Sequence, residues 1–304
     1  MKGIILAGGS GTRLYPLTKV MTKQLQPIYD KPMIYYPLSF LMMMGLKEIL
    51  IISTPEDTPN IKNLLGDGRE LGIQITYIVQ NKPEGIAQAY SLGEDFLNGD
   101  DSMMVLGDNL FYGNYEYFRR AVKKQINKLD NYKARVFAYP VQDPERFGVV
   151  EFEPTTGKVI SLEEKPAEPK SNFAVPGLYI FDGSACEKVK KQLPSERGEL
   201  EITDLNLSYL NEGSLACEII GRGMAWLDTG TPESLLEASN FVHIIEKRQG
   251  LKIACVEEIA VRQGFINISE FELIINTKPK SPYRDYLYSV LSELTMKESH
   301  KKVA

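Results

Sequence analysis

Short β-branched runs alternate with helical patterns along the first half of the chain, which is typical of a parallel sheet joined by crossover helices. Apolar runs predict central strands at residues 3–7, 49–53, 73–79 and 103–106, and helical patterns lie between them at 33–44, 60–65 and 87–96. We therefore expect a Rossmann-like α/β fold, with a mostly parallel sheet flanked by helices.

The pattern of predicted secondary structure changes near residue 135. Shorter strands separated by prolines and glycines are predicted at 135–139, 149–152, 159–163 and 177–181. Helical patterns return after residue 231, at 233–245, 256–263, 269–276 and 286–294, and the charged tail 296–304 is expected to fray. These changes predict three regions, 1–134, an inserted β region at 135–230 within the same domain, and a helical part at 231–304.

Composition excludes several classes of partner. The 304 residues carry a formal charge of −5 with mixed signs, so nothing resembles the basic field that binds nucleic acid. The three cysteines show no CxxC spacing, and no apolar stretch approaches the length needed to span a membrane. We expect a cytoplasmic protein with no nucleic-acid and no membrane partner.

A cluster of glycines follows the first predicted strand directly. A dinucleotide fingerprint would need a third glycine at the position of Leu14, counting from Gly9 and Gly11. A Walker loop would need a Gly-Lys-Ser/Thr sequence that does not follow Gly8 or Gly9. Both well-known nucleotide motifs are therefore absent from this turn.

What remains is a turn built to hold phosphate. Its glycines let backbone N–H groups approach phosphate oxygens, Ser10 and Thr12 add hydroxyl donors, and Arg13 adds a fixed cation. A purely structural turn would not require Arg13. Ligands of open α/β sheets gather at the carboxyl ends of the strands, where this turn, Gln80 and Asp108 all stand.

The loop and several later blocks closely resemble the signature of the sugar nucleotidylyltransferases. The matching blocks run over 8–18, 23–27, 107–113, 143–150, 163–166, 197–204 and 226–231. The pair Lys23-Gln24, where many members have Lys-Pro, resembles the glucose-1-phosphate thymidylyltransferase branch. The resemblance implies transfer of a thymidylyl group from dTTP to α-D-glucose 1-phosphate, with Mg²⁺ as cofactor, giving dTDP-glucose and pyrophosphate.

The resemblance also implies a set of site residues in this chain. Arg13 and Lys23 are the expected catalytic residues, and Asp108 and Asp228 the expected metal ligands. The expected nucleotide-binding residues are Leu6, Gly8, Gly9, Ser10, Gly11, Thr12, Gln24, Gln80, Gly85 and Asp108. The expected sugar-binding residues are Gly148, Glu164, Lys165 and Val175.

The chemistry of the implied reaction fits these residue types. A phosphate monoester has a second pKa of about 6, so the nucleophile is anionic at neutral pH and no general base is needed. The chain has two histidines, His243 and His300, and neither lies near a motif. The obstacle is the meeting of two polyanions, which cations and a metal must relieve. Mg²⁺ prefers carboxylate, phosphate and water oxygens.

Each candidate also has an ordinary structural interpretation. Lys23 could be an exposed lysine, and Asp228 could cap the helix that begins near Thr231. The pair Glu164-Lys165 could be an exposed alternation in a strand, while Gln80 and Gly85 could simply begin a loop. If functional, Gln80 would pair with a pyrimidine edge and Gly85 would leave room beneath the base.

Departures from the pattern of the branch limit what the resemblance carries over. Gln26 stands where the branch usually has Leu, Pro176 stands where it usually has Thr, and segment 114–120 does not match. Because Pro176 lies beside the expected sugar contacts, the identity of the sugar stays open. A uridylyl- or other nucleotidylyltransferase and a non-catalytic nucleotide-sensing subunit are the alternatives, and a Rossmann dehydrogenase is disfavoured by the glycine spacing. The resemblance further implies a homotetramer with feedback by a dTDP-sugar at a second site, and the region after Thr231 would suit subunit contacts.

Overall fold

The structure is a computed structural model that describes residues 1–9, 11–153 and 155–303. Within these ranges one large sheet contains ten strands. They are β1 (Lys2–Ala7), β4 (Glu48–Ser53), β5 (Gln74–Val79), β6 (Ser102–Leu106), β8 (Ala134–Pro140), β9 (Gly148–Phe152), β10 (Val159–Glu164), β11 (Phe173–Val175), β12 (Leu178–Phe181) and β13 (Leu215–Ile219). Two small antiparallel pairs lie apart from it, β2 (Pro27–Ile28) with β3 (Lys31–Pro32), and β7 (Asn109–Tyr112) with β14 (Ala225–Asp228).

The large sheet is mostly parallel in strand direction, as predicted. Its order is β10-β9-β11-β8-β12-β6-β1-β4-β5, with β13 paired to β8. The pairings show that β5, β4, β1, β6, β8, β9 and β13 run one way, while β12, β11 and β10 run the other way. The reversals all fall in the later half of the chain, where the sequence predicts shorter, turn-separated strands. The two halves therefore share one continuous sheet.

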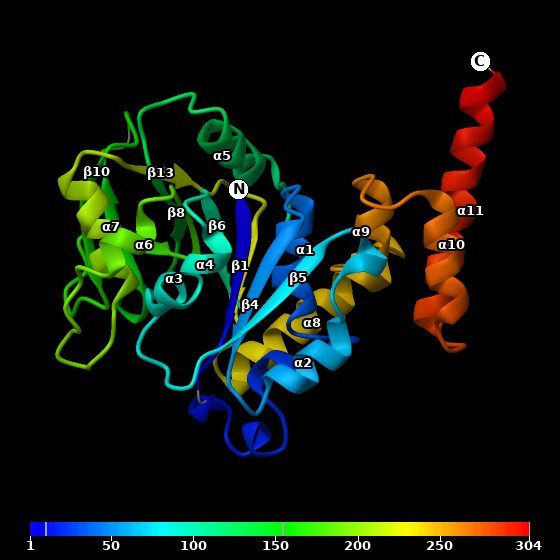
Figure 1. The fold of residues 1–304 in the computed structure, drawn as a ribbon, viewed down its shortest axis with the longest axis horizontal. Coiled ribbons are helices and arrows are strands. Elements are labelled where there is room, and N and C mark those ends of the chain that lie inside the picture. The colour runs from blue at the N-terminus through cyan, green and yellow to red at the C-terminus, as the bar shows by residue number, and fades with distance from the viewer. Residues whose placement is uncertain (10, 154, 304) are drawn as a thin grey trace.

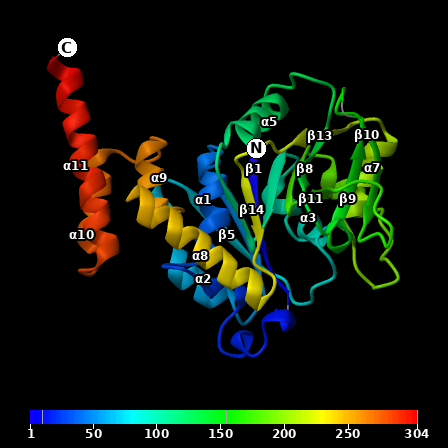
Figure 2. The ribbon, with the colours of Figure 1, turned by 180° about the vertical axis from the view of Figure 1, so that it is seen from behind.

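Helices cover both faces of this sheet (Figures 1 and 2). They are α1 (Tyr35–Met43), α2 (Thr58–Leu65), α3 (Gln88–Leu92), α4 (Glu94–Leu97), α5 (Glu116–Ile126), α6 (Ala185–Val189), α7 (Ile202–Asn211), α8 (Pro232–Gln249), α9 (Val256–Arg262), α10 (Ile268–Thr277) and α11 (Pro282–Val303). Alternate strand residues divide the core, since Ile5 packs with α1, α5 and α9 on one face and Ile4 packs with α3, α6 and α7 on the other. Figure 1 shows α10 and α11 at one end of the molecule, beyond α9.

Two predictions about helices need correction. The single helix expected at 87–96 is two short helices, α3 and α4, because Gly93 adopts φ −88° and ψ 6° and ends the first one. The tail expected to fray is helical, since α11 continues to Val303. An i,i+4 ion pair between Glu293 and Lys297, together with good helix-forming residues, supports this last stretch. Ala304 lies outside the described residues.

The strand and helix predictions otherwise match closely, although the sequence did not indicate β2, β3, β7, β11, β13, β14, α5, α6 or α7. Of the helices in the described ranges, none is both long enough and apolar enough to cross a membrane.

Candidate active site

Two cavities adjoin at the carboxyl ends of β1 and β6. The loop cavity, of about 240 Å³, is lined by Gly8, Gly9, Gly11, Thr12, Arg13, Leu14, Lys23, Gln24, Asp108 and Gly230. The strand cavity, of about 190 Å³, includes Arg13, Asp108, Gly148, Glu164, Lys165, Val175 and Asp228 in its walls. Arg13 and Asp108 line both cavities, so the cavities meet at these two side chains.

The glycine turn forms one wall of the loop cavity. Gly11 has φ +58° and its carbonyl accepts a hydrogen bond of 3.0 Å from the Thr18 hydroxyl, which holds the turn against the next loop. A Cβ added at Gly11 would lie 2.7 Å from Thr18 Cγ2, so this position has no room for a side chain. Ser10, predicted here as a phosphate donor, lies outside the described residues.

Lys23 is buried and points at an acid. Its side chain is largely covered, and Nζ forms an ion pair with Asp108 Oδ2. The interpretation of Lys23 as an ordinary exposed lysine is therefore wrong. Burial alone would raise the pKa of Asp108, but Lys23 and a 2.8 Å hydrogen bond from Asn109 Nδ2 outweigh it and hold this pKa below its usual value.

A small β ladder brings the second acid to the first. Strand β14 pairs with β7 so that Asp228 stands opposite Asn109, next to Asp108. Thr229 completes the junction, because its hydroxyl donates to the Asp108 carbonyl at 2.8 Å and its N–H donates to the same oxygen at 3.2 Å. Burial and the nearby Asp108 carboxylate raise the pKa of Asp228. Two carboxylates held this close favour a cation between them.

Asp228 is not a helix cap. The N-cap of α8 is Thr231, whose hydroxyl accepts from the Ser234 N–H at 3.2 Å in a reciprocal capping box. Gly230 lies between the acid and the loop cation. A Cβ at Gly230 would lie 2.9 Å from Asp228 Oδ1 and 3.1 Å from Arg13 Cζ. The absence of a side chain there lets the Arg13 guanidinium lie close to Asp228.

Gln80 is buried under the glycine turn in a fixed orientation. The backbone N–H of Glu84 donates to Gln88 Oε1 at 3.0 Å, which identifies that atom as an oxygen. Gln80 Nε2 donates to the same oxygen at 2.6 Å, so Gln80 Oε1 is the end directed at Gly8. A Cβ at Gly8 would lie 1.9 Å from Gln80 Oε1. An acceptor thus faces the glycine turn.

Of the other expected nucleotide residues, Gln24 lines the loop cavity, whereas Leu6, Gln80 and Gly85 are not among the residues that line either cavity. Gln24 is buried beside Gly107, and Leu6 is in β1, where its carbonyl accepts from the Gly107 N–H at 2.8 Å. Gly85 has φ +103°, and the backbone of Leu200 occupies the space of a side chain, 2.3 Å from the Cβ position. The backbone of Leu200, just before α7, packs against Gly85 in the space that a side chain would need.

Strand register assembles the expected sugar residues. Gly148 in β9 pairs with Glu164 of β10 on one side and with Val175 of β11 on the other. A Cβ at Gly148 would lie 3.4 Å from Glu164 Oε2. Glu164 accepts a 2.7 Å hydrogen bond from the Thr203 hydroxyl, and its other oxygen lies 3.5 Å from Lys165 Nζ. These residues line one cavity, so the pair Glu164-Lys165 is more than an exposed alternation.

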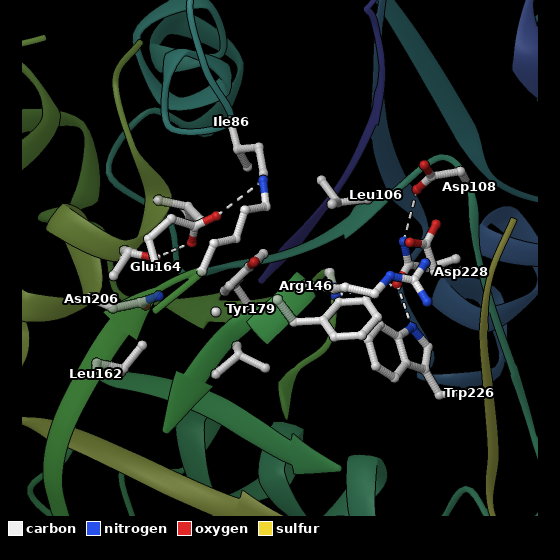
Figure 3. Close-up of a pocket in the computed structure, with 18 of the residues that line it drawn as sticks. Ile86, Leu106, Asp108, Arg146, Leu162, Glu164, Tyr179, Asn206, Trp226 and Asp228 are labelled. Carbon is white, nitrogen blue, oxygen red and sulfur yellow. Dashed lines mark hydrogen bonds and ion pairs between the residues drawn. The ribbon is translucent and has the colours of Figure 1, made fainter. Parts of the chain in front are cut away.

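The sequence interpretation missed several residues of the strand cavity. They are Ile86, Asn109, Arg146, Tyr179, Thr203, Asn206 and Trp226. Asn109 fixes the geometry of the acids, since its Oδ1 accepts from Trp226 Nε1 at 2.6 Å and from the Gly177 N–H at 3.2 Å. Figure 3 shows Asp108, Asp228 and Trp226 at one end of the cavity and Glu164 and Asn206 at the other. Membership of the matching sequence blocks was the available signal for Asn109, Arg146, Thr203 and Trp226.

Two further residues clarify the surroundings of the site. His243 packs on Tyr29, with ring centroids 5.0 Å apart, and is not among the residues that line either cavity. Gln26, which departs from the expected pattern, is buried, and its Nε2 donates at 3.2 Å to the carbonyls of Leu17 and Met21. Gln26 therefore fixes the loop that precedes Lys23.

Comparisons with known proteins show the family of the chain. The family model described as nucleotidyl transferase matches residues 2–244. A protein of Neisseria meningitidis serogroup A is 53% identical over 96% of this chain and all of its own length, and one of Xanthomonas campestris is 54% identical over 94% of this chain and 95% of its own length. Both are named glucose-1-phosphate thymidylyltransferase. A solved structure from Bacillus anthracis described by the same activity, in complex with a sucrose, superimposes with a TM-score of 0.73 at 44% identity, covering 79% of this chain and 94% of that one.

Proposed function

The chain belongs to the nucleotidyl transferase family, and we propose on that basis that it transfers the thymidylyl group of dTTP to α-D-glucose 1-phosphate, giving dTDP-glucose and pyrophosphate. The observation that carries the proposal is the junction of the two cavities at Arg13 and Asp108. A nucleotide in the loop cavity and a sugar phosphate in the strand cavity would meet there.

The reacting groups need positive charge more than they need a base. The attacking phosphate oxygen is already anionic at neutral pH, since the second pKa of a phosphate monoester is about 6. Charge builds on the transferring phosphoryl group and on the leaving pyrophosphate. Arg13 and Lys23 converge on the junction and are the groups that would stabilise this charge. Lys23 also forms an ion pair with Asp108.

The acid pair Asp108 and Asp228 is the proposed holder of Mg²⁺. Two carboxylates fit the protein share of a typical magnesium site, in which substrate phosphates and water supply the other oxygens. When bound, the ion would neutralise phosphate charge and polarise the phosphoryl oxygens. The role of the chain is to fix the acids, which the β7–β14 ladder and Asn109 do before any substrate arrives.

Gln80 and the glycine turn are proposed to bind the nucleotide. A thymine ring presents an N3–H donor, and Gln80 Oε1 is an acceptor directed at the turn. Uracil presents the same donor, so Gln80 selects a pyrimidine with N3–H and does not by itself separate dTTP from UTP. Backbone groups of Gly8, Gly9 and Gly11 would meet the phosphates.

Glu164, Lys165 and backbone groups at Gly148 and Val175 are proposed to bind the sugar phosphate. The hydrogen bond from Thr203 holds Glu164 at the cavity wall, and Lys165 has φ +44°, a conformation that the surrounding structure must support. A carboxylate accepts from sugar hydroxyls, while the Lys165 ammonium group can approach the phosphate.

A matrix of initial rates tests the reaction. Pyrophosphate release would be measured with dTTP, UTP, CTP, GTP and ATP, each crossed with several sugar 1-phosphates. We expect the fastest release with dTTP and glucose 1-phosphate, and release only when both are present. A strong preference for UTP would make the chain a uridylyltransferase, and no release with any pair would favour a nucleotide-sensing subunit.

Assembly, location and regulation form a second part of the proposal. We infer a cytoplasmic homotetramer that a dTDP-sugar inhibits at a second site, with subunit contacts in residues 231–304. A cavity of about 400 Å³ supports the second site alone, because its walls combine Tyr112, Tyr115 and Tyr286 with Arg119, Lys252 and Arg262, groups suited to a base and to phosphates. Light scattering would measure the assembly, and inhibition by dTDP-sugars that adding glucose 1-phosphate does not relieve would support a second site.

A further inference from the structure

Asn206 is a buried amide that the described residues leave without a hydrogen-bond partner. It lies on α7 and is 1% exposed, yet both Nδ2 and Oδ1 lack partners. Buried side-chain amides are normally satisfied, and leaving one unpaired is costly. The same helix satisfies its other polar groups near this point, since Thr203 bonds to Glu164. An unpaired amide in this setting indicates that something outside the chain completes it.

The position of Asn206 in the strand cavity indicates which part of a substrate could be its hydrogen-bond partner. Ile202, Thr203 and Asn206 lie on one face of α7 and line the strand cavity. Figure 3 shows the Asn206 amide extending from α7 toward the interior, at the end of the cavity where Glu164 lies and across from Asp108 and Asp228. The acid pair marks the end where phosphates react. Asn206 therefore lies at the end of the cavity where the body of the sugar would bind in the proposed reaction.

A hydroxyl group is the hydrogen-bond partner that best fits the amide of Asn206. An amide offers a donor and an acceptor side by side, and a sugar hydroxyl both donates and accepts, so the two groups complement each other. A phosphate only accepts, and its natural partners in this cavity are Arg13 and Lys165. Apolar neighbours, Leu162 and Val175, surround this part of the wall and exclude competing water.

We propose that Asn206 is a specificity-determining residue that hydrogen-bonds a ring or hydroxymethyl hydroxyl of the sugar 1-phosphate. This inference rests on the proposed function and extends it to a residue that neither the sequence motifs nor strand register pointed out. A site whose amide hydrogen-bonds a substrate hydroxyl rejects analogues that lack this hydroxyl, because the amide is then left buried and unpaired.

The test pairs one substitution with a series of sugars. Asn206→Leu keeps the approximate size of the side chain and removes both polar atoms, and Asn206→Ala serves if the leucine variant does not fold. Asn211→Leu, the same change at an exposed position of α7, is the matched control. Each protein would be assayed for kcat/KM with glucose 1-phosphate and with its 2-, 3-, 4- and 6-deoxy analogues at saturating dTTP.

We expect Asn206→Leu to lower kcat/KM for glucose 1-phosphate by about tenfold to hundredfold, with little change in KM for dTTP. The wild type should lose a similar factor on one deoxy analogue, and the variant should lose almost nothing more on that analogue. The melting temperature of the variant should stay level or rise, since an unpaired buried amide has been removed. Asn211→Leu should behave as the wild type.

Three outcomes would overturn the inference. Unchanged kcat/KM in Asn206→Leu means that the amide holds only a water molecule. An equal loss on every sugar, without coupling to any single hydroxyl, means that the role of Asn206 is structural. If the wild type forms no nucleotide sugar from any pair in the rate matrix, the proposed function fails and this inference fails with it, whereas the first two outcomes leave the proposed function standing.

Discussion

Gly8→Ala should damage nucleotide binding through a single contact. The added Cβ would lie 1.9 Å from Gln80 Oε1. To reach an ordinary contact distance the amide oxygen must move by about 1.5 Å. Gly8 is not among the glycines with positive φ, so the backbone itself accepts alanine. The effect of Gly8→Ala on nucleotide binding should therefore come from displacement of the Gln80 side chain alone.

The displacement has a definite cost. Gln80 is buried, and its Nε2 is held by Gln88, which the Glu84 backbone N–H orients. Moving the amide breaks the 2.6 Å hydrogen bond to Gln88 and takes Oε1 away from the place where a pyrimidine N3–H would meet it. Each lost hydrogen bond costs about 1 kcal/mol, and a buried group left unpaired costs about 1–3 kcal/mol. We expect kcat/KM for dTTP to fall by about tenfold to hundredfold.

A double-mutant cycle checks this reasoning. Steady-state rates at varied dTTP would be measured for Gly8→Ala, Gln80→Ala and the double variant. Gln80→Ala removes the oxygen that the new methyl group meets, so Gly8→Ala should cost little more in that background. Independent, additive effects of the two substitutions would refute the steric argument, as would an unchanged KM for dTTP in Gly8→Ala. The KM for glucose 1-phosphate should change little in all three.

Three other substitutions test the charge and packing arguments. Asp108→Asn should lower kcat at least about a hundredfold by weakening the proposed metal site, and a wild-type rate with unchanged Mg²⁺ dependence would contradict that assignment. Lys23→Ala should also lower kcat by about a hundredfold while the KM for glucose 1-phosphate shifts little. Equal effects on kcat and KM would indicate simple ground-state binding by Lys23. Gly85→Ala should reduce the free energy of unfolding by about 2 kcal/mol or more, because φ is +103° and the Leu200 carbonyl oxygen lies 2.3 Å from the new Cβ. An unchanged urea midpoint would contradict it.

The sequence predicts the nucleotide half of the fold well for a physical reason. Strands β1, β4 and β6 lie side by side in a parallel part of the sheet and are largely buried, and strands buried on both faces read as continuous apolar runs. The glycine turn follows β1 without a gap, so its position at the edge of the sheet follows from local information. The helix at 87–96 was harder, because a glycine inside a helical pattern either continues the helix or ends it, and packing decides.

The contacts that complete the site are not local. Asp108 and Asp228 are brought together by the β7–β14 ladder, a pairing that a sequence pattern cannot reveal without the register of the strands. Gly148, Glu164 and Val175 come together in the same way across β10, β9 and β11. A resemblance to a known family supplied these residues as a set, but only the register explains why they lie together.

The charges that line the two cavities support the proposal that a divalent cation accompanies the substrates. Four cationic side chains line these walls, Arg13, Lys23, Arg146 and Lys165, against three acidic ones, Asp108, Glu164 and Asp228. One phosphate monoester brings a charge of about −2, and a nucleoside triphosphate brings more. The walls therefore cannot balance both substrates. A buried ion pair is weak evidence of stabilisation. The pairing of Lys23 with Asp108 is better explained by their proposed roles, phosphate binding for Lys23 and metal binding for Asp108. Asp108 and Asp228 are the residues that would hold a divalent ion, which would supply positive charge to the site, and Lys23 is the group beside Asp108 that could then contact the phosphate.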